Sequence, residues 1–243
     1  MIKYLTLKIL NIFDFFHQRR IIKFLHKKGF KDFNIVLDVG AHKGESINFF
    51  LSNFRVTTIY SFEASPITFK ILSNKINYFR NKFKDSKLII ENYAIGAFRK
   101  KVLLKQLKES SSSTIRNLNE NSKYFKKKLF FLQGYKKGSF FKEIEVEQIK
   151  LNDYLINHNI SNVDFLKIDT EGYEFEVLTG AKEAFSKIST VLFEHHYDDM
   201  ITKNYKFSDI HNLLLINNFT QLYKSKMPFR KTFEYIYINK LKK

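Results

Sequence analysis

The chain has 243 residues, 44 % of them apolar, which suits one large domain with a packed core and excludes global disorder. Because there is no cysteine, a disulfide framework, a cysteine-ligated zinc site and a cysteine nucleophile are excluded. The net charge of +18, from 42 Lys and Arg against 24 Asp and Glu, favours anionic partners: nucleic acid, anionic lipid or phosphorylated substrates. The same surplus is typical of an AT-rich coding sequence, so the charge alone selects no partner.

Residues 1–30 are predicted to form a basic amphipathic helical extension before a domain over residues 31–243. Apolar residues recur at helical spacing, at Ile2, Leu5, Ile9, Ile12, Phe13 and Phe16, and basic residues follow, at Arg19, Arg20, Lys23, Lys27 and Lys28. No apolar run reaches the roughly 20 residues of a membrane span, and no signal-peptide cleavage site follows. We therefore expect a cytoplasmic protein, whose first helix either packs on the domain core or lies on an anionic membrane through residues 1–28.

From residue 35, short apolar runs alternate with helical periodicity. Strands are predicted at 35–39, 57–62, 88–90, 163–168 and 190–193, and helices at 45–51, 67–79, 151–158, 173–185 and 208–217. This alternation predicts an α/β fold with a mostly parallel sheet and helices on both faces.

Two regions depart from the alternation. Strands predicted at 102–107 and 144–149 flank a Lys- and Ser-rich insertion at about 108–142, interpreted as an insertion or lid on one face of the sheet. Near the end, strands predicted at 219–223 and 233–238 have no helix between them. They therefore predict an antiparallel hairpin at the edge of the sheet.

The first predicted strand runs into a D-x-G-x-x-x-G pattern at a strand-to-helix turn, from Asp38 through Gly40 and His42 to Gly44. Open α/β sheets bind ligands at this edge, and glycine lets the backbone approach a ligand closely. His42 stands where a dinucleotide-binding loop has its second glycine, and the P-loop pattern is absent. The turn therefore favours a phosphate-free nucleoside with a cationic end, S-adenosylmethionine, and we expect His42 to shape the pocket.

Side chains at neighbouring strand tips complete the predicted cofactor site. Glu63 ends the second strand, 63 − 40 = 23 residues after the first glycine, close to the spacing of about 20 residues for a ribose-binding acid. Asp38 is expected near the amino-acid end of the ligand. The adenine edge is expected at Asn92 and Ala94. The predicted cofactor-binding set is Asp38, Gly40, His42, Gly44, Glu63, Asn92 and Ala94.

Four blocks of the sequence resemble the FkbM-type methyltransferases. They cover residues 37–44, 61–66, 92–96 and 164–174, the last of which, DFLKIDTEGYE, is the most specific. The resemblance runs in order over roughly residues 35–225 and leaves out the N-terminal helix and the insertion. It implies a class I methyltransferase Rossmann-like sheet, S-adenosylmethionine as methyl donor, and O-methylation, often of sugars or secondary metabolites.

Carboxylates gather where the strand at 163–168 ends. Methyl transfer to a hydroxyl needs an aligned oxygen and a group that takes its proton. We expect Asp169 to contact the acceptor or the methionine moiety and Glu171 to contact the acceptor. His195, after the next strand, is the predicted proton acceptor, with His196 as its alternative. These side chains match no strong metal-binding motif, so no metal is expected.

The sequence thus predicts an S-adenosylmethionine-dependent O-methyltransferase acting on a hydroxyl of a saccharide, glycolipid or related metabolite. One alternative is an RNA ribose 2′-O-methyltransferase, which is disfavoured because residues 170–181 contain no Lys or Arg. The other is a non-catalytic membrane-docking module that keeps the fold. The expected partners are a small-molecule or glycan acceptor and an anionic membrane surface, rather than nucleic acid.

Overall fold

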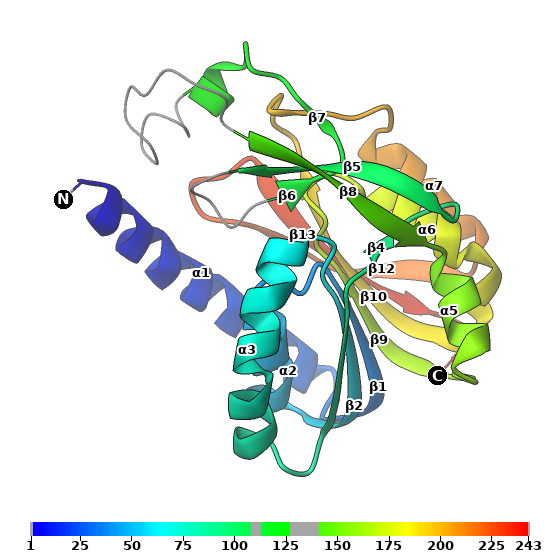
Figure 1. Cartoon of the computed structure of the whole chain (residues 1–243). Helices are drawn as coiled ribbons and strands as arrows, with labels where there is room; N and C mark the ends of the chain where they lie inside the picture. The colour runs from blue at the N-terminus through cyan, green and yellow to red at the C-terminus, as the bar shows by residue number, and fades with distance from the viewer. Residues whose placement is uncertain (1, 108–112, 127–140, 243) are drawn as a thin grey trace.

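The computed structural model describes residues 2–107, 113–126 and 141–242. Its centre is a seven-stranded sheet with strand order β12-β13-β10-β9-β1-β2-β3 (Figure 1). All neighbouring pairs from β10 to β3 are parallel, and β13 runs antiparallel to both its neighbours. The predicted mostly parallel sheet with an antiparallel C-terminal hairpin is confirmed. The strands are β1 (Asp32–Val39), β2 (Arg55–Phe62), β3 (Lys87–Glu91), β9 (Val163–Ile168), β10 (Ile188–His196), β12 (Phe219–Lys226) and β13 (Thr232–Asn239).

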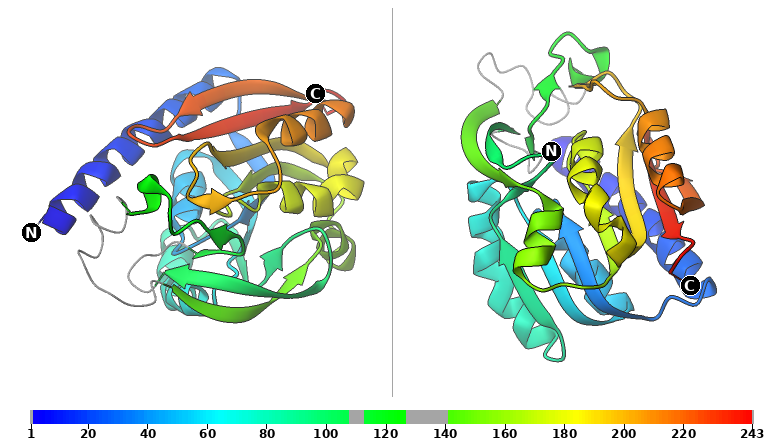
Figure 2. Two further views of the ribbon diagram at one scale, coloured as in Figure 1. Left: turned by 90° about the horizontal axis from the view of Figure 1, so that it is seen from above. Right: turned by 90° about the vertical axis from the view of Figure 1, so that its right-hand side faces the viewer.

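Helices cover both faces of this sheet (Figure 2). Successive residues of a strand point to opposite faces, so Val36 belongs to one core and Leu37 to the other. The first core packs against α1 (Ile2–Lys27), α2 (Glu45–Asn53) and α3 (Pro66–Lys82). The second packs against α5 (Leu151–Asn157), α6 (Glu174–Ala181), the 3₁₀ helix η1 (Lys182–Lys187) and α7 (Phe207–Ile216).

The strands predicted around the insertion do not join the main sheet. They are β5 (Lys100–Leu107) and β8 (Phe141–Ile149), which pair antiparallel and form a second, four-stranded sheet with β4 (Ala94–Ile95) and β6 (Ser113–Thr114). This sheet has its own small apolar core, which includes Val102 and Val146. A two-stranded sheet joins β7 (Asn117–Leu118) to β11 (Ile201–Thr202). Residues 108–112 and 127–140 of the predicted insertion lie outside the described residues.

From residue 13 onward, α1 packs along the C-terminal hairpin (Figure 2). Leu25 is fully buried, and Phe24 stacks on Tyr223 of β12 with 4.2 Å between ring centroids. His17 Nε2 lies 2.7 Å from a carboxylate oxygen of Glu234 on β13. No helix among the described residues has the length and apolar content needed to cross a lipid bilayer. The predicted domain boundary near residue 30 stays a prediction.

Replacing Leu25 with alanine should lower the free energy of unfolding by about 2–5 kcal/mol, because it leaves a cavity under α1. Phe16→Ala on the same helix is the control, since this side chain is 55 % exposed. The control should change stability by no more than about 0.5 kcal/mol. Urea unfolding followed by circular dichroism measures both variants, and equal stabilities would contradict the packing of α1 on the sheet.

Candidate active site

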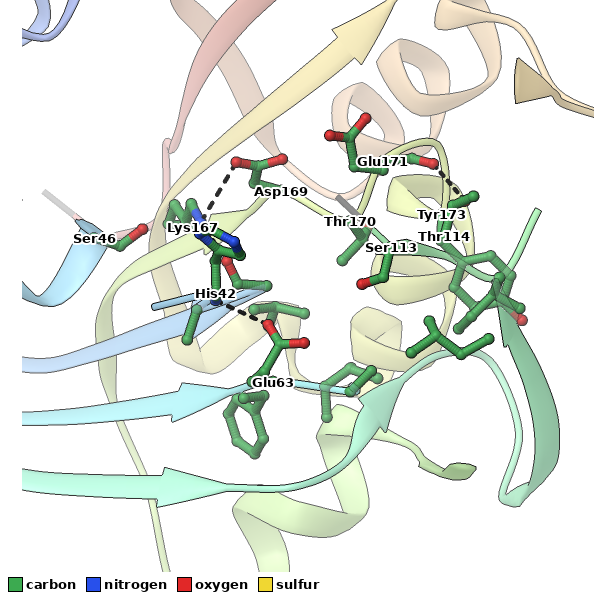
Figure 3. A pocket seen from close by; sticks show the side chains of 18 of the residues that line it. His42, Ser46, Glu63, Ser113, Thr114, Lys167, Asp169, Thr170, Glu171 and Tyr173 are labelled. Carbon is green, nitrogen blue, oxygen red and sulfur yellow. Dashed lines mark hydrogen bonds and ion pairs between the residues drawn. The ribbon is translucent and has the colours of Figure 1, made fainter. Parts of the chain in front are cut away.

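The main pocket lies at the C-terminal ends of β1, β2 and β9, between the large sheet and β6 (Figure 3). Its volume of about 380 Å³ suits a small organic ligand. Five of the predicted site residues line it: Gly40, His42, Glu63, Asp169 and Glu171.

Gly40 allows two strand ends to meet at the floor of the pocket. Its φ is +85°, and a Cβ at this position would overlap the carbonyl oxygen of Asp169. The backbone N–H of Asp169 donates to the carbonyl of Val39 at 2.9 Å. Only glycine combines this backbone angle with so close a neighbour. Gly40 was expected to let the backbone approach a ligand. In the structure it lets the backbone of Asp169 approach the glycine turn.

Glu63 points into the pocket from the tip of β2 (Figure 3). Its carboxylate accepts the backbone N–H groups of His42 and Ser65, both at 2.8 Å. Burial raises its pKa, even though these two amides favour the charged form. His42 has a φ of +49°, and its Nδ1 lies 3.0 Å from Glu45 of α2, so His42 and Glu63 hold the turn together.

Asp38 lies beneath the pocket in a buried ion pair and does not line the cavity. It faces Lys167 across the β1–β9 register, and its Oδ1 lies 3.1 Å from Lys167 Nζ. Ser61 of β2 donates to the other carboxylate oxygen at 3.3 Å. Lys167 also donates to the carbonyl of Gly40 at 3.0 Å and lies 3.8 Å from Asp169. The predicted contact of Asp38 with a ligand is thus replaced by a contact that positions Lys167.

His196, rather than His195, lies on the pocket side of β10. Its Nε2 is 3.4 Å from Glu171 and 3.1 Å from Glu194. Burial disfavours the charged imidazole, but the carboxylates of Asp198 and Glu194 outweigh it and raise the pKa of His196 well above its usual range. His196 is therefore an imidazolium at neutral pH and compensates the charge of Glu171 and Glu194.

Asp169 is the carboxyl group in this site with the strongest base character. Burial, followed by the nearby charge of Glu194, raises its pKa well above the usual range, and Lys167 only partly opposes this. Figure 3 shows Asp169 between Lys167 and the loop that carries Glu171. A carboxylate with a raised pKa holds a proton more firmly than an ordinary aspartate, so Asp169 is better suited than an ordinary aspartate to accept one.

His195 packs on the opposite face of β10, because successive side chains of a strand alternate. Its ring lies against Tyr197, with centroids 4.7 Å apart, and near Phe207. Burial, together with the charge of Lys203, lowers the pKa of His195 to about 3. Neither His195 nor His196 is among the residues that line the pocket, and the role of His195 as proton acceptor stays a prediction.

Three other predicted cofactor residues support the pocket without lining it. Gly44 precedes α2 with a φ of +94° and packs against Phe79. The side chain of Asn92 donates to the carbonyls of Glu63 and Ala64, at 2.7 and 3.2 Å, and so fixes the tip of β2. Ala94 is buried in the core of the second sheet. The adjacent Tyr93 and Ile95 line the pocket instead.

One side of the pocket, formed by α1, the C-terminal hairpin and the insertion, was not predicted from the sequence. Asp14 of α1 and Arg230 of the β12–β13 turn line it and form an ion pair at 2.8 Å. Thr114 of β6 lines it too, and its hydroxyl donates to the carbonyl of Glu171 at 2.8 Å (Figure 3). One signal was present: Asp14 is the only acidic residue within residues 2–28.

His195→Phe should keep turnover close to that of the parent protein and reduce its sensitivity to acid. The pKa of His195 has its ordinary value of 6.5 in the unfolded chain and is about 3 in the folded chain. Between these two pH values the unfolded chain binds a proton that the folded chain does not, so acid favours unfolding there. Thermal unfolding in a series of buffers from neutral pH to about pH 4 should show a smaller loss of stability in the variant. His196→Gln is the contrasting variant, and its turnover should fall. A large loss of turnover in His195→Phe alone would return the base role to His195.

Three comparisons place the chain among known proteins. The family model for the methyltransferase FkbM domain matches residues 38–222. A solved structure of methyltransferase FkbM from Methylobacillus flagellatus is 16 % identical with a TM-score of 0.54, and the match covers 84 % of this chain and 43 % of that chain. The chain thus spans less than half the length of this protein. A comparison with curated proteins found no match.

Two further structures share the fold. Magnesium protoporphyrin IX methyltransferase from Synechocystis, solved with bound S-adenosylmethionine, has a TM-score of 0.53 at 10 % identity over 96 % of this chain and 82 % of that chain. TrmK from M. capricolum, in complex with S-adenosylhomocysteine, has a TM-score of 0.51 at 12 % identity over 93 % of this chain and 69 % of that chain. Because the family model spans most of the residues that build the pocket, the chain belongs to the FkbM methyltransferase family.

Proposed function

We propose that this methyltransferase uses S-adenosylmethionine to methylate a hydroxyl group of a saccharide, glycolipid or related metabolite. The observation that carries the proposal is the buried carboxylate of Glu63 at the tip of β2, which faces the pocket while backbone amides fix its orientation. An acid at this position suits the two hydroxyls of a ribose.

The charge of the pocket supports a cationic ligand. Five carboxylates line it, from Asp14, Glu45, Glu63, Asp169 and Glu171, against two cations that stay charged at every relevant pH, Lys167 and Arg230. This acidic pocket lies in a chain whose net charge is +18. Burial is the main cause of the raised pKa values of Glu63 and Asp169, and a cationic ligand beside them would favour their charged forms.

When bound, S-adenosylmethionine supplies an electrophilic methyl group on a positively charged sulfur. Glu63 is suited to hold the ribose hydroxyls. Tyr93 and Ile95 line the neighbouring part of the pocket and would contact the adenine of the cofactor. Asp169 and Glu171, on the β9 side, supply the negative charge that a sulfonium and an ammonium favour. The residues present therefore fit this cofactor.

Asp169 is the proposed proton acceptor. It would take the proton of the acceptor hydroxyl as the hydroxyl oxygen bonds to the methyl carbon and the methyl–sulfur bond breaks, which leaves a neutral thioether. General-base assistance of this kind contributes about 10²–10⁴ in rate. Lys167 is a positioning residue, since its contacts with Asp38 and Gly40 fix the cation beside Asp169. His196 contacts the carboxylate of Glu171 at 3.4 Å and so helps to position it at the pocket wall.

The acceptor side of the pocket favours a polyhydroxyl compound. Asp14, Arg230, Ser113, Thr114 and Glu171 line the pocket from α1, the hairpin turn, β6 and the β9–α6 loop. Carboxylates, hydroxyls and a guanidinium together donate and accept hydrogen bonds, as a sugar requires. Over the whole pocket carboxylates outnumber Lys and Arg, which disfavours the phosphates of RNA, so the RNA alternative is the weaker one.

Glu63→Gln should weaken S-adenosylmethionine binding about 10- to 100-fold, because it removes one charged hydrogen-bond acceptor from the ribose site. Isothermal titration calorimetry measures the dissociation constant. Glu91→Gln is the matched control: Glu91 ends β3 and accepts the hydroxyl of Tyr154 at 2.9 Å, outside this pocket. Equal affinities of the two variants would remove Glu63 from the cofactor site.

Asp169→Asn should lower turnover by about 10²–10⁴ while changing cofactor affinity much less. Turnover is measured by transfer of a labelled methyl group to extracted glycans, glycolipids and, for comparison, RNA. In the parent protein the rate should rise with pH as Asp169 loses its proton, and this rise should be absent in the variant. A variant with the parent rate and pH profile would exclude Asp169 as the base, and methylation of RNA alone would refute the proposed acceptor.

A further inference from the structure

The outer side of α1 and the tip of the C-terminal hairpin carry exposed aromatic rings beside the pocket. Phe15 and Phe16 are 50 % and 55 % exposed, and Phe229 at the hairpin turn is 76 % exposed. The rings of Phe15 and Phe16 are 5.8 Å apart, and Phe229 contacts Phe13 of α1 at 4.7 Å. We call Phe15, Phe16 and Phe229, with the exposed cations around them, the docking face.

The docking face adjoins the pocket on α1 and on the β12–β13 turn. Asp14 precedes Phe15, and Arg230 follows Phe229. Both of these charged residues line the pocket and pair with each other at 2.8 Å. A surface that binds the docking face therefore lies at the rim of the acceptor side of the site.

The charge of the docking face is uniformly positive on its outer side. Residues 2–28 contain seven Lys and Arg and one acidic residue, Asp14, which is directed to the pocket. The guanidinium of Arg19 lies 4.7 Å from the ring centroid of Phe15. Among the side chains that the structure describes, Arg20 and Lys23 of α1 and Lys226 and Lys231 beside the hairpin turn are exposed too.

Exposed phenylalanines flanked by Lys and Arg are the composition of a surface that binds anionic lipid. The rings enter the boundary between head groups and acyl chains, and the cations pair with lipid phosphates. An isolated exposed ring needs no explanation, but a group of rings on a basic rim does. RNA would be attracted by the same cations, yet carboxylates outnumber Lys and Arg among the residues that line the adjoining pocket, and carboxylates repel phosphates.

We propose that the docking face binds an anionic membrane surface and thereby presents the pocket to a saccharide acceptor that is anchored in the membrane by a lipid. The nature of the acceptor rests on the proposed function, whereas the membrane contact is tested without it. In this arrangement the bilayer contacts the protein at α1 and the hairpin tip. The saccharide head group of an anchored acceptor then enters the pocket beside Asp14 and Arg230.

The test is co-sedimentation of the full chain with phosphatidylcholine vesicles that contain or lack phosphatidylglycerol. The parent protein should bind the anionic vesicles and bind the neutral ones much more weakly. The partition coefficient of the triple variant F15S/F16S/F229S for anionic vesicles should fall about tenfold or more, because three rings no longer enter the bilayer. The matched control is F98S/I216S/L241S, which removes apolar side chains that are 68–74 % exposed at other places on the molecule.

Each outcome decides the proposal. Vesicle binding that is absent in the parent, or equal in the two triple variants, overturns it, and so does RNA binding that the F15S/F16S/F229S variant alone loses. Thermal unfolding and calorimetry with S-adenosylmethionine check that both variants are folded and keep the cofactor site. A protein that binds cofactor but no vesicles refutes the membrane contact alone, whereas one that binds vesicles but no cofactor refutes the proposed function alone.

Discussion

The site depends on the meeting of β1 and β9 at Gly40. The absence of a side chain there lets the backbone of Asp169 lie against the glycine turn, and a buried Lys167–Asp38 ion pair locks the two strands in this register. A buried ion pair adds little net stability when it is intact, but removing either partner leaves a costly uncompensated charge. The strand register and the position of Asp169 thus have one common physical origin.

The sequence predicted the central fold well, because each element there carries a strong local pattern. Alternating apolar runs and helices predict the parallel sheet, and the lack of a helix between β12 and β13 predicts the hairpin. Sequence periodicity cannot say which strands share a sheet, so it predicted β5 and β8 as strands but not the separate sheet that they form. Strand pairing over long distances depends on tertiary packing, which no local window contains.

Only part of the candidate site could be predicted, because side-chain directions and long-range contacts depend on the tertiary fold. Residues at strand tips follow from topology, and Glu63 and Asp169 lie where the strand ends placed them. The direction of a side chain depends on strand parity, which the sequence leaves open by one residue, as His195 and His196 show. Asp38 and Asn92 were predicted near the ligand and instead brace residues that line the pocket. Asp14 and Arg230 come from segments outside the recognised motifs, and only the tertiary fold brings them together.

The pairing of Asp14 with Arg230 joins the first helix to the last hairpin at the wall of the pocket. The two residues are 216 positions apart in the chain. During synthesis the N-terminal part leaves the ribosome first and begins to fold before the hairpin exists. The acceptor side of the pocket is therefore completed only after the hairpin has been synthesised and has folded against α1.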